Sequence, residues 1–218
     1  MLYKILYAQN RARLAGTERH VLYLLDHLNR KRFEPSVVCF MQGPLVEVIS
    51  QRGVPAFALP RKRVFDYGHF RELRQLIKDG GFDLVHSHSG QWACLAARTA
   101  GVTRTIETRH GLCLDYNAAE RHAVRNAVVS KIKAAHVSMT VVVSQADYRI
   151  MHEKYRIPAE RLRCVLNGID PASVQVSASE KQHVRAEFGS TDSRIVGCVS
   201  RLESQKGLEY LIRAMVHL

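Results

Sequence analysis

The 218-residue sequence lacks the cysteine spacings that mark a zinc knuckle or a disulfide-stapled domain. Its cysteines are five in number and far apart, and no two of them form a C-x-x-C pair. An odd, scattered set favours reduced thiols in or near strands over a disulfide framework. These cysteines are Cys39, Cys94, Cys113, Cys164 and Cys198.

Long apolar runs and dinucleotide fingerprints are also missing. No stretch approaches the ~20 apolar residues that cross a bilayer. The first eight residues are too short and too interrupted for a signal peptide. The absence of a G-x-G-x-x-G motif weighs against a nicotinamide or flavin enzyme. We therefore expect a cytoplasmic protein that at most lies peripherally on the inner face of a membrane.

The sequence is rich in basic residues. Its 32 Lys and Arg exceed its 20 Asp and Glu, which gives a formal net charge of +12. This balance favours anionic partners such as nucleic acid, acidic lipid or phosphorylated substrates. The cations are dispersed and no nucleic-acid motif accompanies them, so we expect no specific nucleic-acid partner.

Apolar runs alternate with amphipathic segments along most of the chain, which predicts an α/β fold with a Rossmann-like, doubly wound parallel sheet. The expected strands are 2–8, 36–40, 54–59, 84–87, 103–108, 140–143 and 162–166. The first expected helix begins near Gly16. Further helices are expected at 44–51, 70–78, 91–100, 119–135 and 145–155. The predicted domains are an N-terminal domain (1–170), a polar linker (171–193) with a helix near 180–188, and the incomplete start of a second domain (194–218).

The stretch from Val196 to Gly207 predicts a buried strand followed by a loop with two cations, Arg201 and Lys206. A helix then begins at Leu208. Ligands of open α/β sheets bind at the carboxyl ends of strands. Arg offers a planar fork to phosphate oxygens and Lys a mobile point charge. The pattern indicates a diphosphate clamp, with a solvated charged loop as the alternative.

Gly16 follows the first strand and precedes the first helix. A glycine at such a junction lets the backbone approach a ligand closely, and the helix N-terminus presents free N–H groups to an anion. The alternative is a glycine that only makes the turn.

Six short motifs, in order, resemble those of the family 4 glycosyltransferases, retaining enzymes of the GT-B fold. They are Ala15-Gly16-Thr17-Glu18-Arg19, Asp83 to Ser89, Arg109-His110-Gly111, Val143-Ser144, Val165 to Asp170, and Val199 to Leu202 with Lys206-Gly207. The resemblance implies two Rossmann-like domains with a sugar nucleotide in the cleft between them.

The resemblance also implies residue roles. Arg201 and Lys206 would bind the donor diphosphate, Gly16 and Thr17 would lie near the donor phosphates or transferred sugar, and His110 would contact that sugar as the catalytic-site residue. A structural histidine at a strand end is the alternative for His110. The sequence departs from the family pattern at Ala15, where the family has a second glycine. It also departs from the family pattern in its second domain, which has only the 26 residues from Ser193 to Leu218. A complete α/β domain of this kind needs on the order of 100 residues or more.

Two further groups of residues are candidate sites. His86 and His88 have the spacing of two metal ligands on one strand face, but no third ligand motif such as H-E-x-x-H supports a metal. We expect His88 or Ser89 to line the acceptor side. The basic loop with Arg61, Lys62 and Arg63 is a second acceptor-side candidate. It either contacts an anionic membrane, at ~1 kcal/mol per cation, or is a solvated loop.

The predicted function is sugar transfer, with retention, from a nucleotide-diphosphate sugar to a polysaccharide or lipid-linked acceptor. The departing diphosphate would be stabilised by Arg201, Lys206 and helix N-termini, with no metal or other cofactor. One alternative is a catalytically inactive, truncated binding module that retains only the acceptor-side domain. Another is a general anion or nucleic-acid binder driven by the +12 charge.

Overall fold

The computed structural model describes residues 1–62, 66–88, 91–111, 135–189 and 194–217. The chain divides into two compact units, Met1–Ile169 and Asp170–Leu218. The predicted helix at 119–135 falls almost wholly outside the described residues, as do the candidate residues Arg63 and Ser89.

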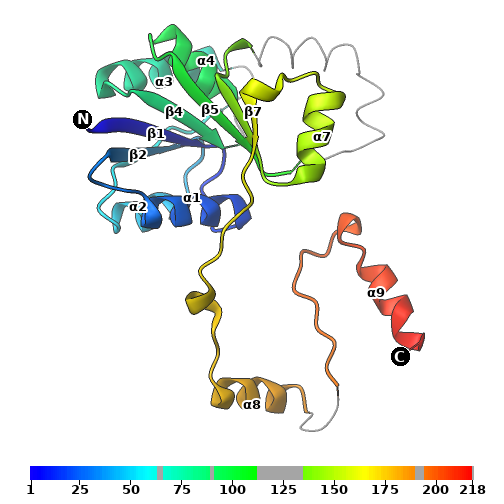
Figure 1. Ribbon diagram of the computed structural model, residues 1–218. Helices are drawn as coiled ribbons and strands as arrows, with labels where there is room; N and C mark the ends of the chain where they lie inside the picture. The colour runs from blue at the N-terminus through cyan, green and yellow to red at the C-terminus, as the bar shows by residue number, and fades with distance from the viewer. Residues whose placement is uncertain (63–65, 89–90, 112–134, 190–193, 218) are drawn as a thin grey trace. The chain divides into compact units, whose positions relative to one another are not determined.

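Within its described ranges, the first unit is built on seven parallel strands in the order β3-β2-β1-β4-β5-β6-β7 (Figure 1). They are β1 (Tyr3–Gln9), β2 (Phe33–Cys39), β3 (Ala56–Ala58), β4 (Leu84–His88), β5 (Arg104–Arg109), β6 (Met139–Val142) and β7 (Leu162–Cys164). Strand addition reverses direction after β3, so the switch point lies between β1 and β4. Ligands of open parallel sheets bind at the carboxyl ends of the strands beside such a point.

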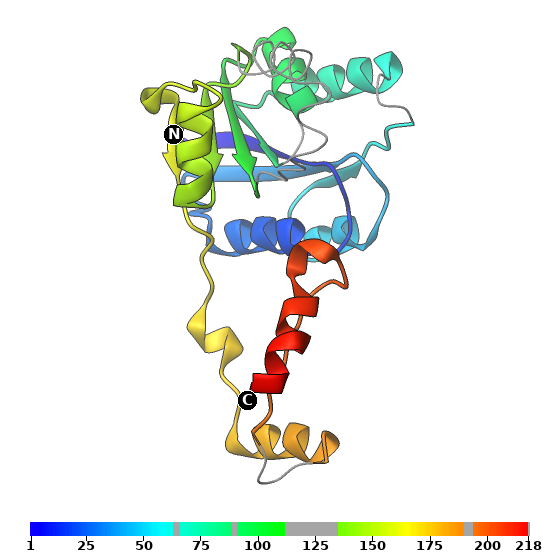
Figure 2. The same cartoon turned by 90° about the vertical axis from the view of Figure 1, so that its right-hand side faces the viewer.

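Helices cover both faces of this sheet, as the doubly wound pattern predicted. Helices α1 (Gly16–His27) and α2 (Pro44–Ser50) lie on one face, and α3 (Tyr67–Gly80) and α4 (Gln91–Thr99) lie on the other (Figures 1 and 2). Apolar side chains of β1 point alternately to the two faces of the sheet, so helices must cover both faces. Ile5 and Tyr7 pack in the core under α1 and α2, whereas Leu6 and Ala8 pack in the core under α3 and α4.

Local capping fixes several helix starts. The Asp66 side chain accepts a hydrogen bond from the His69 backbone N–H and begins α3. Ser144, predicted as an N-cap, accepts one from the Asp147 N–H and begins α7 (Gln145–Glu153). A small third core of Val142, Met151 and Leu162 joins α7 to β6 and β7.

The second unit contains α8 (Ala178–Glu187), begun by a capping box between Ser177 and Glu180. It also contains α9 (Leu208–Ala214) and the short helices η2 (Pro171–Val174), η3 (Ser204–Lys206) and η4 (Met215–His217). The predicted helix at Leu208 is confirmed.

The buried strand expected from Val196 is not formed. Val196 and Val199 are exposed and take no strand conformation. The described part of this unit holds no other strand, and backbone N–H and C=O groups form a strand only by pairing with a neighbour.

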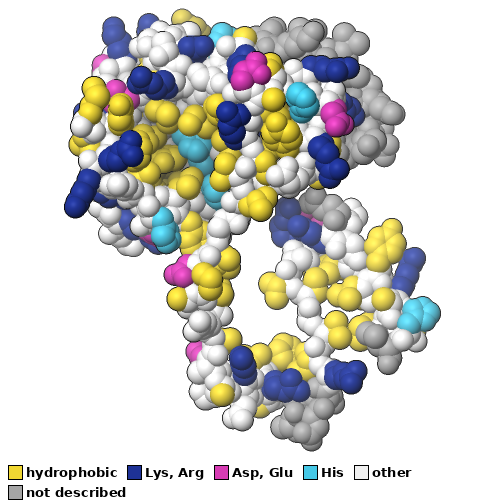
Figure 3. All heavy atoms as spheres, viewed as in Figure 1, with side chains coloured by type: hydrophobic (Ala, Val, Ile, Leu, Met, Phe, Trp, Pro, Cys, Tyr) yellow, Lys and Arg dark blue, Asp and Glu magenta, His cyan; other side chains and the backbone are white. Residues whose placement is uncertain are grey.

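No helix in the described ranges is long and apolar enough to span a bilayer. Lys and Arg side chains are spread over the visible face of the first unit rather than gathered in one patch (Figure 3). This distribution agrees with the dispersed cations of the sequence.

Candidate functional site

Four histidines and a tyrosine meet at the carboxyl ends of the central strands. His86 and His88 lie on β4, and His110 directly follows β5. Tyr7 of β1 and His20 of α1 complete the histidine cluster. The two-residue spacing places both β4 rings on the face covered by α1, because alternate strand residues share a face.

Contacts within the cluster are close. A hydrogen bond of 2.9 Å joins His88 Nδ1 and His110 Nε2, and another of 2.7 Å joins His86 Nε2 to the Thr108 hydroxyl. The rings of His20 and His110 stand edge to face with centroids 4.8 Å apart, and those of His86 and His88 are 4.3 Å apart. The register explains this, because His86 and His88 are level with Ile106 and Thr108 of β5.

Burial keeps these rings neutral. It lowers the pKa of His86 to about 3 and that of His110 to about 4, with the neighbouring histidines adding to the effect. It also lowers the pKa of His20, and it lowers that of His88 well below the ordinary value. At neutral pH the cluster therefore offers uncharged donors and acceptors, which suit sugar hydroxyls or a metal ion.

Gly16 is the first residue of α1, and a Cβ atom added to it would meet no other atom within 4 Å. The fold itself therefore leaves open space at Gly16. Ala15 supplies no capping side chain. The backbone of Thr17 is held by a 3.4 Å hydrogen bond from the Gln9 side chain at the end of β1. His20 follows one turn later on the same helix.

Arg201 and Lys206 lie on one exposed loop of the second unit. The Arg201 guanidinium donates to the Glu203 carboxylate at 2.6 Å, and no pattern in the sequence predicted this partner. Lys206 ends η3, and Gly207 with φ 63° turns the chain into α9. Their predicted convergence on Gly16 and His110 stays a prediction, because it joins the two units.

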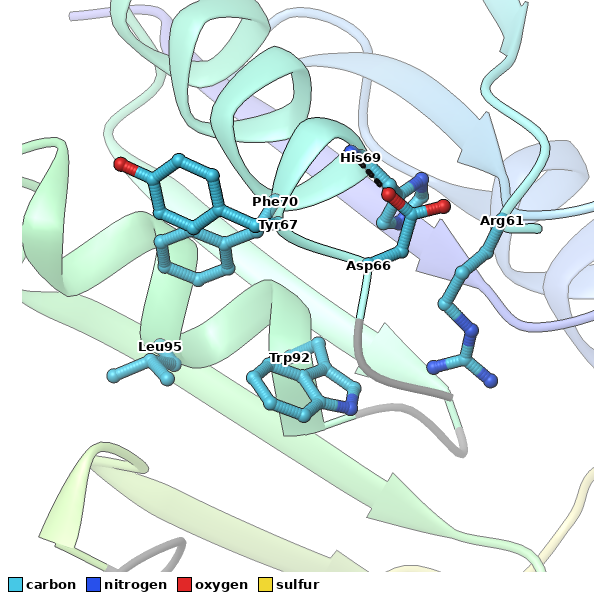
Figure 4. Close-up of a pocket in the computed structure, with 7 residues that line it drawn as sticks. All are labelled: Arg61, Asp66, Tyr67, His69, Phe70, Trp92 and Leu95. Atoms are coloured by element: carbon cyan, nitrogen blue, oxygen red, sulfur yellow. Dashed lines mark hydrogen bonds between the residues drawn. The ribbon is translucent and has the colours of Figure 1, made fainter. Parts of the chain in front are cut away.

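A pocket of about 330 Å³ opens between the first turns of α3 and α4. The view in Figure 4 shows apolar side chains on one side and polar ones on the other. Phe70 and Trp92 stand edge to face with centroids 6.3 Å apart. The lining residues are Arg61, Asp66, Tyr67, His69, Phe70, Trp92 and Leu95.

Asp66 organises the polar side of this pocket. Its carboxylate accepts hydrogen bonds from the backbone N–H groups of His69 and Lys62, and these bonds lower its pKa. Among the predicted acceptor-side cations, Arg61 lines the pocket, and Lys62 is exposed on the same loop. His88 belongs to the histidine cluster on the opposite face of the sheet, and its acceptor-side role stays a prediction.

Sequence reasoning missed His20 and the aromatic pocket. One signal for His20 was present, because it lies one helical turn beyond Gly16 and so near the same helix end. Phe70 and Trp92 gave no such signal, since they come from two helices and meet only in the folded chain.

Comparisons with known proteins agree with this architecture. Residues 14–173 match the family model described as Glycosyltransferase Family 4. Over 226 residues the chain is 24% identical to the UDP-Gal:alpha-D-GlcNAc-diphosphoundecaprenol alpha-1,3-galactosyltransferase of Escherichia coli. That alignment covers 99% of the chain and 58% of the relative.

Solved structures share the fold. Anabaena Alr3699/HepE, in complex with UDP and glucose, superposes with a TM-score of 0.78 at 20% identity. The superposition covers 99% of the present chain and 58% of the HepE chain. A Rickettsia africae glycosyltransferase gives a TM-score of 0.77 at 18% identity, and the superposition covers 98% of the present chain and 57% of that protein. The chain thus spans a little over half the length of these proteins.

Proposed function

Because the chain belongs to glycosyltransferase family 4, we propose that it acts in the transfer of a sugar from a nucleotide-diphosphate donor to a lipid-linked or polysaccharide acceptor, with retention. The chain supplies the acceptor-side domain and the loop with Arg201 and Lys206. The observation that carries this proposal is the neutral histidine cluster at the carboxyl ends of β4 and β5, beside α1.

In this proposal His110 holds a hydroxyl of the transferred sugar. A neutral imidazole donates through one ring nitrogen and accepts through the other. His110 also contacts His88, and that hydrogen bond orients its ring. The α1 N-terminus at Gly16 and Thr17 faces the donor phosphates, where free N–H groups favour negative charge.

Arg201 and Lys206 stabilise the departing diphosphate. Negative charge develops on the leaving oxygen as the sugar bond breaks, and a fixed cation pair lowers that barrier. Glu203 holds the Arg201 guanidinium in place before the donor arrives. These cations take the role that a metal ion has in other transferases, so transfer requires no metal.

The pocket between α3 and α4 receives the acceptor. Its aromatic side suits the hydrocarbon or sugar of a lipid-linked acceptor, and Arg61 suits the phosphate. The E. coli relative supports this reading, since its name specifies a diphosphoundecaprenol acceptor. Arg61 and Lys62 also suit an anionic membrane surface.

A transfer assay tests the proposal. UDP-, GDP- and ADP-sugars are each incubated with an undecaprenyl-diphosphate-linked acceptor and this chain, either alone or completed with the carboxyl-terminal part of the E. coli relative. We expect transfer by the completed protein, product with the donor's anomeric configuration by proton NMR, and no loss of rate in EDTA.

Acceptor binding without transfer by the completed protein would instead support the inactive binding module. Retention on duplex DNA that responds to salt but not to sugar nucleotides would support the general anion binder.

A further inference from the structure

Three histidines of the cluster converge on one point. His20, His88 and His110 each offer a ring nitrogen, and these nitrogens all lie within 4.8 Å of one another. They come from three separate elements, namely α1, β4 and the end of β5. Such convergence needs the whole first unit to fold and does not follow from any one local sequence pattern.

The hydrogen bonding of His88 is incomplete. Its side chain is fully buried, and Nδ1 is joined to His110. Its Nε2 has no hydrogen-bond partner in the part of the chain that the structure describes. Whichever nitrogen carries the proton, one buried polar atom stays unsatisfied. A buried polar atom without a partner costs stability, so other contacts hold the His88 ring in place, and its Nδ1 is the nitrogen that faces His110.

We propose that His20, His88 and His110 form a binding site for one divalent transition-metal ion of the zinc type. Neutral imidazole nitrogen is a preferred ligand of Zn²⁺, Co²⁺, Ni²⁺ and Cu²⁺, whereas Mg²⁺ and Ca²⁺ take oxygen. Three histidines and one water complete a tetrahedral zinc site.

The geometry is close to what such an ion requires. Zinc–nitrogen bonds of 2.0–2.1 Å at tetrahedral angles place ligand nitrogens roughly 3.3 Å apart. The 2.9 Å separation of His88 Nδ1 and His110 Nε2 is near that value. His20 and His110 are only half-buried, so their rings have room to adjust around an ion.

Metal binding has a consequence for the proposed transfer reaction. His110 is the residue assigned to the transferred sugar, and an ion bound to it would occupy that position. Zinc would therefore inhibit a reaction that needs no metal. This consequence rests on the proposed function, whereas the binding itself does not.

Cobalt titration tests the binding directly. The untagged 218-residue chain is freed of metal with a chelator, and CoCl₂ is added while visible absorption is recorded. We expect the intense band of four-coordinate Co²⁺ to saturate at one equivalent, to disappear on addition of ZnCl₂, and to be unaffected by MgCl₂.

Two ligand variants and one control locate the site. His20→Asn and His110→Asn should each weaken Co²⁺ binding by at least about tenfold, because each removes a ligand. His27→Asn removes an exposed histidine from the same helix, α1, and should bind as the unchanged chain does. Far-UV circular dichroism verifies that the three variants are folded.

An unchanged chain that gives no four-coordinate band, or ligand variants that bind Co²⁺ as His27→Asn does, would overturn the proposal. The transfer assay with and without ZnCl₂ is read separately. A completed protein that transfers no sugar would count against the proposed function and leave the cobalt result standing.

Discussion

The cysteines of the chain differ in their exposure to solvent, because Cys39 and Cys94 of the first unit are buried. Burial raises the pKa of the Cys39 and Cys94 thiols to about 12, and the charges of Glu18 and Glu107 add to it. Cys198 of the second unit is exposed. The thiolate is the reactive form of cysteine, so exposure and pKa together determine its rate of alkylation.

We therefore expect iodoacetamide to alkylate Cys198 at least tenfold faster than Cys39 or Cys94 in the native chain. Peptide mass spectrometry at timed intervals measures each cysteine separately. In urea the three rates should converge, which serves as the control. Equal rates in the native protein would contradict the burial of the Cys39 and Cys94 thiols.

His69 makes the stability of the first unit sensitive to acid. Its ring packs edge to face on Phe40, with centroids 4.9 Å apart. Burial lowers its pKa, and Arg61 adds to that effect, whereas the carboxylates of Asp66 and Glu72 oppose it. The unfolded chain thus binds a proton more readily than the folded one, and the stability this neutral ring contributes is lost as pH falls below about 6.5.

The variant His69→Phe keeps an aromatic ring against Phe40 and cannot be protonated. We expect its free energy of unfolding to fall less than that of the unchanged chain between pH 7.5 and pH 5, as measured by urea denaturation. His27→Asn, an exposed histidine, is the control and should leave the slope unaltered. If the unfolding free energy of His69→Phe changed with pH as that of the unchanged chain does, the contribution assigned to His69 would be refuted.

At the scale of elements, helix caps are the local interactions that most directly follow from sequence. Ser144 Oγ accepts the Asp147 N–H at 3.0 Å, and α7 then packs Met151 into the core with Val142 and Leu162. Ser177 caps α8 in the same way, but α8 has no buried residue.

Ser144→Ala should therefore lower the free energy of unfolding of the first unit by about 1 kcal/mol, because the helix loses its N-cap. Urea denaturation followed by the circular dichroism of the sheet measures the change. The matched substitution Ser177→Ala should leave that transition within error. A Ser144→Ala transition that coincides with the unchanged one would disprove the role of the cap.

The elements also show where sequence reasoning succeeds. Periodicity and chain punctuation predicted the alternation of strands and helices, and the predicted parallel sheet is confirmed because each element carries its own pattern. The prediction of a strand at Val196 is wrong. An apolar run favours strand formation, but a strand also needs a neighbouring strand to pair with, and the described part of the second unit offers none.

The site was foreseen only in part. Gly16, His88 and His110 lie at strand or helix ends that the sequence indicates. His20 and the Phe70–Trp92 pair depend on how α1 packs on β4 and how α3 packs beside α4, which no short segment encodes.

At the scale of the whole molecule, the described core belongs to the first unit. Every buried hydrophobic residue in the described ranges lies at or before Leu162. Ile212 and Met215 of the second unit are exposed. Burial of apolar surface is the main favourable contribution to folding, so the two units should differ in stability.

We expect a chain ending at Ile169 to unfold with the same urea midpoint as the 218-residue chain, since it keeps that core. Trypsin should cut the second unit before the first, because cleavage needs local opening and few buried contacts resist it there. Denaturation and timed mass spectrometry provide the measurements. A lower midpoint on truncation would show that the second unit stabilises the first.

The two outermost strands of the sheet, β3 and β7, are each only three residues long. An open sheet ends in unpaired amide and carbonyl groups to which a strand from another molecule can add. Here those borders offer about one or two such groups on each side. The first unit should consequently remain monomeric when it is concentrated, with neither margin long enough to recruit another copy.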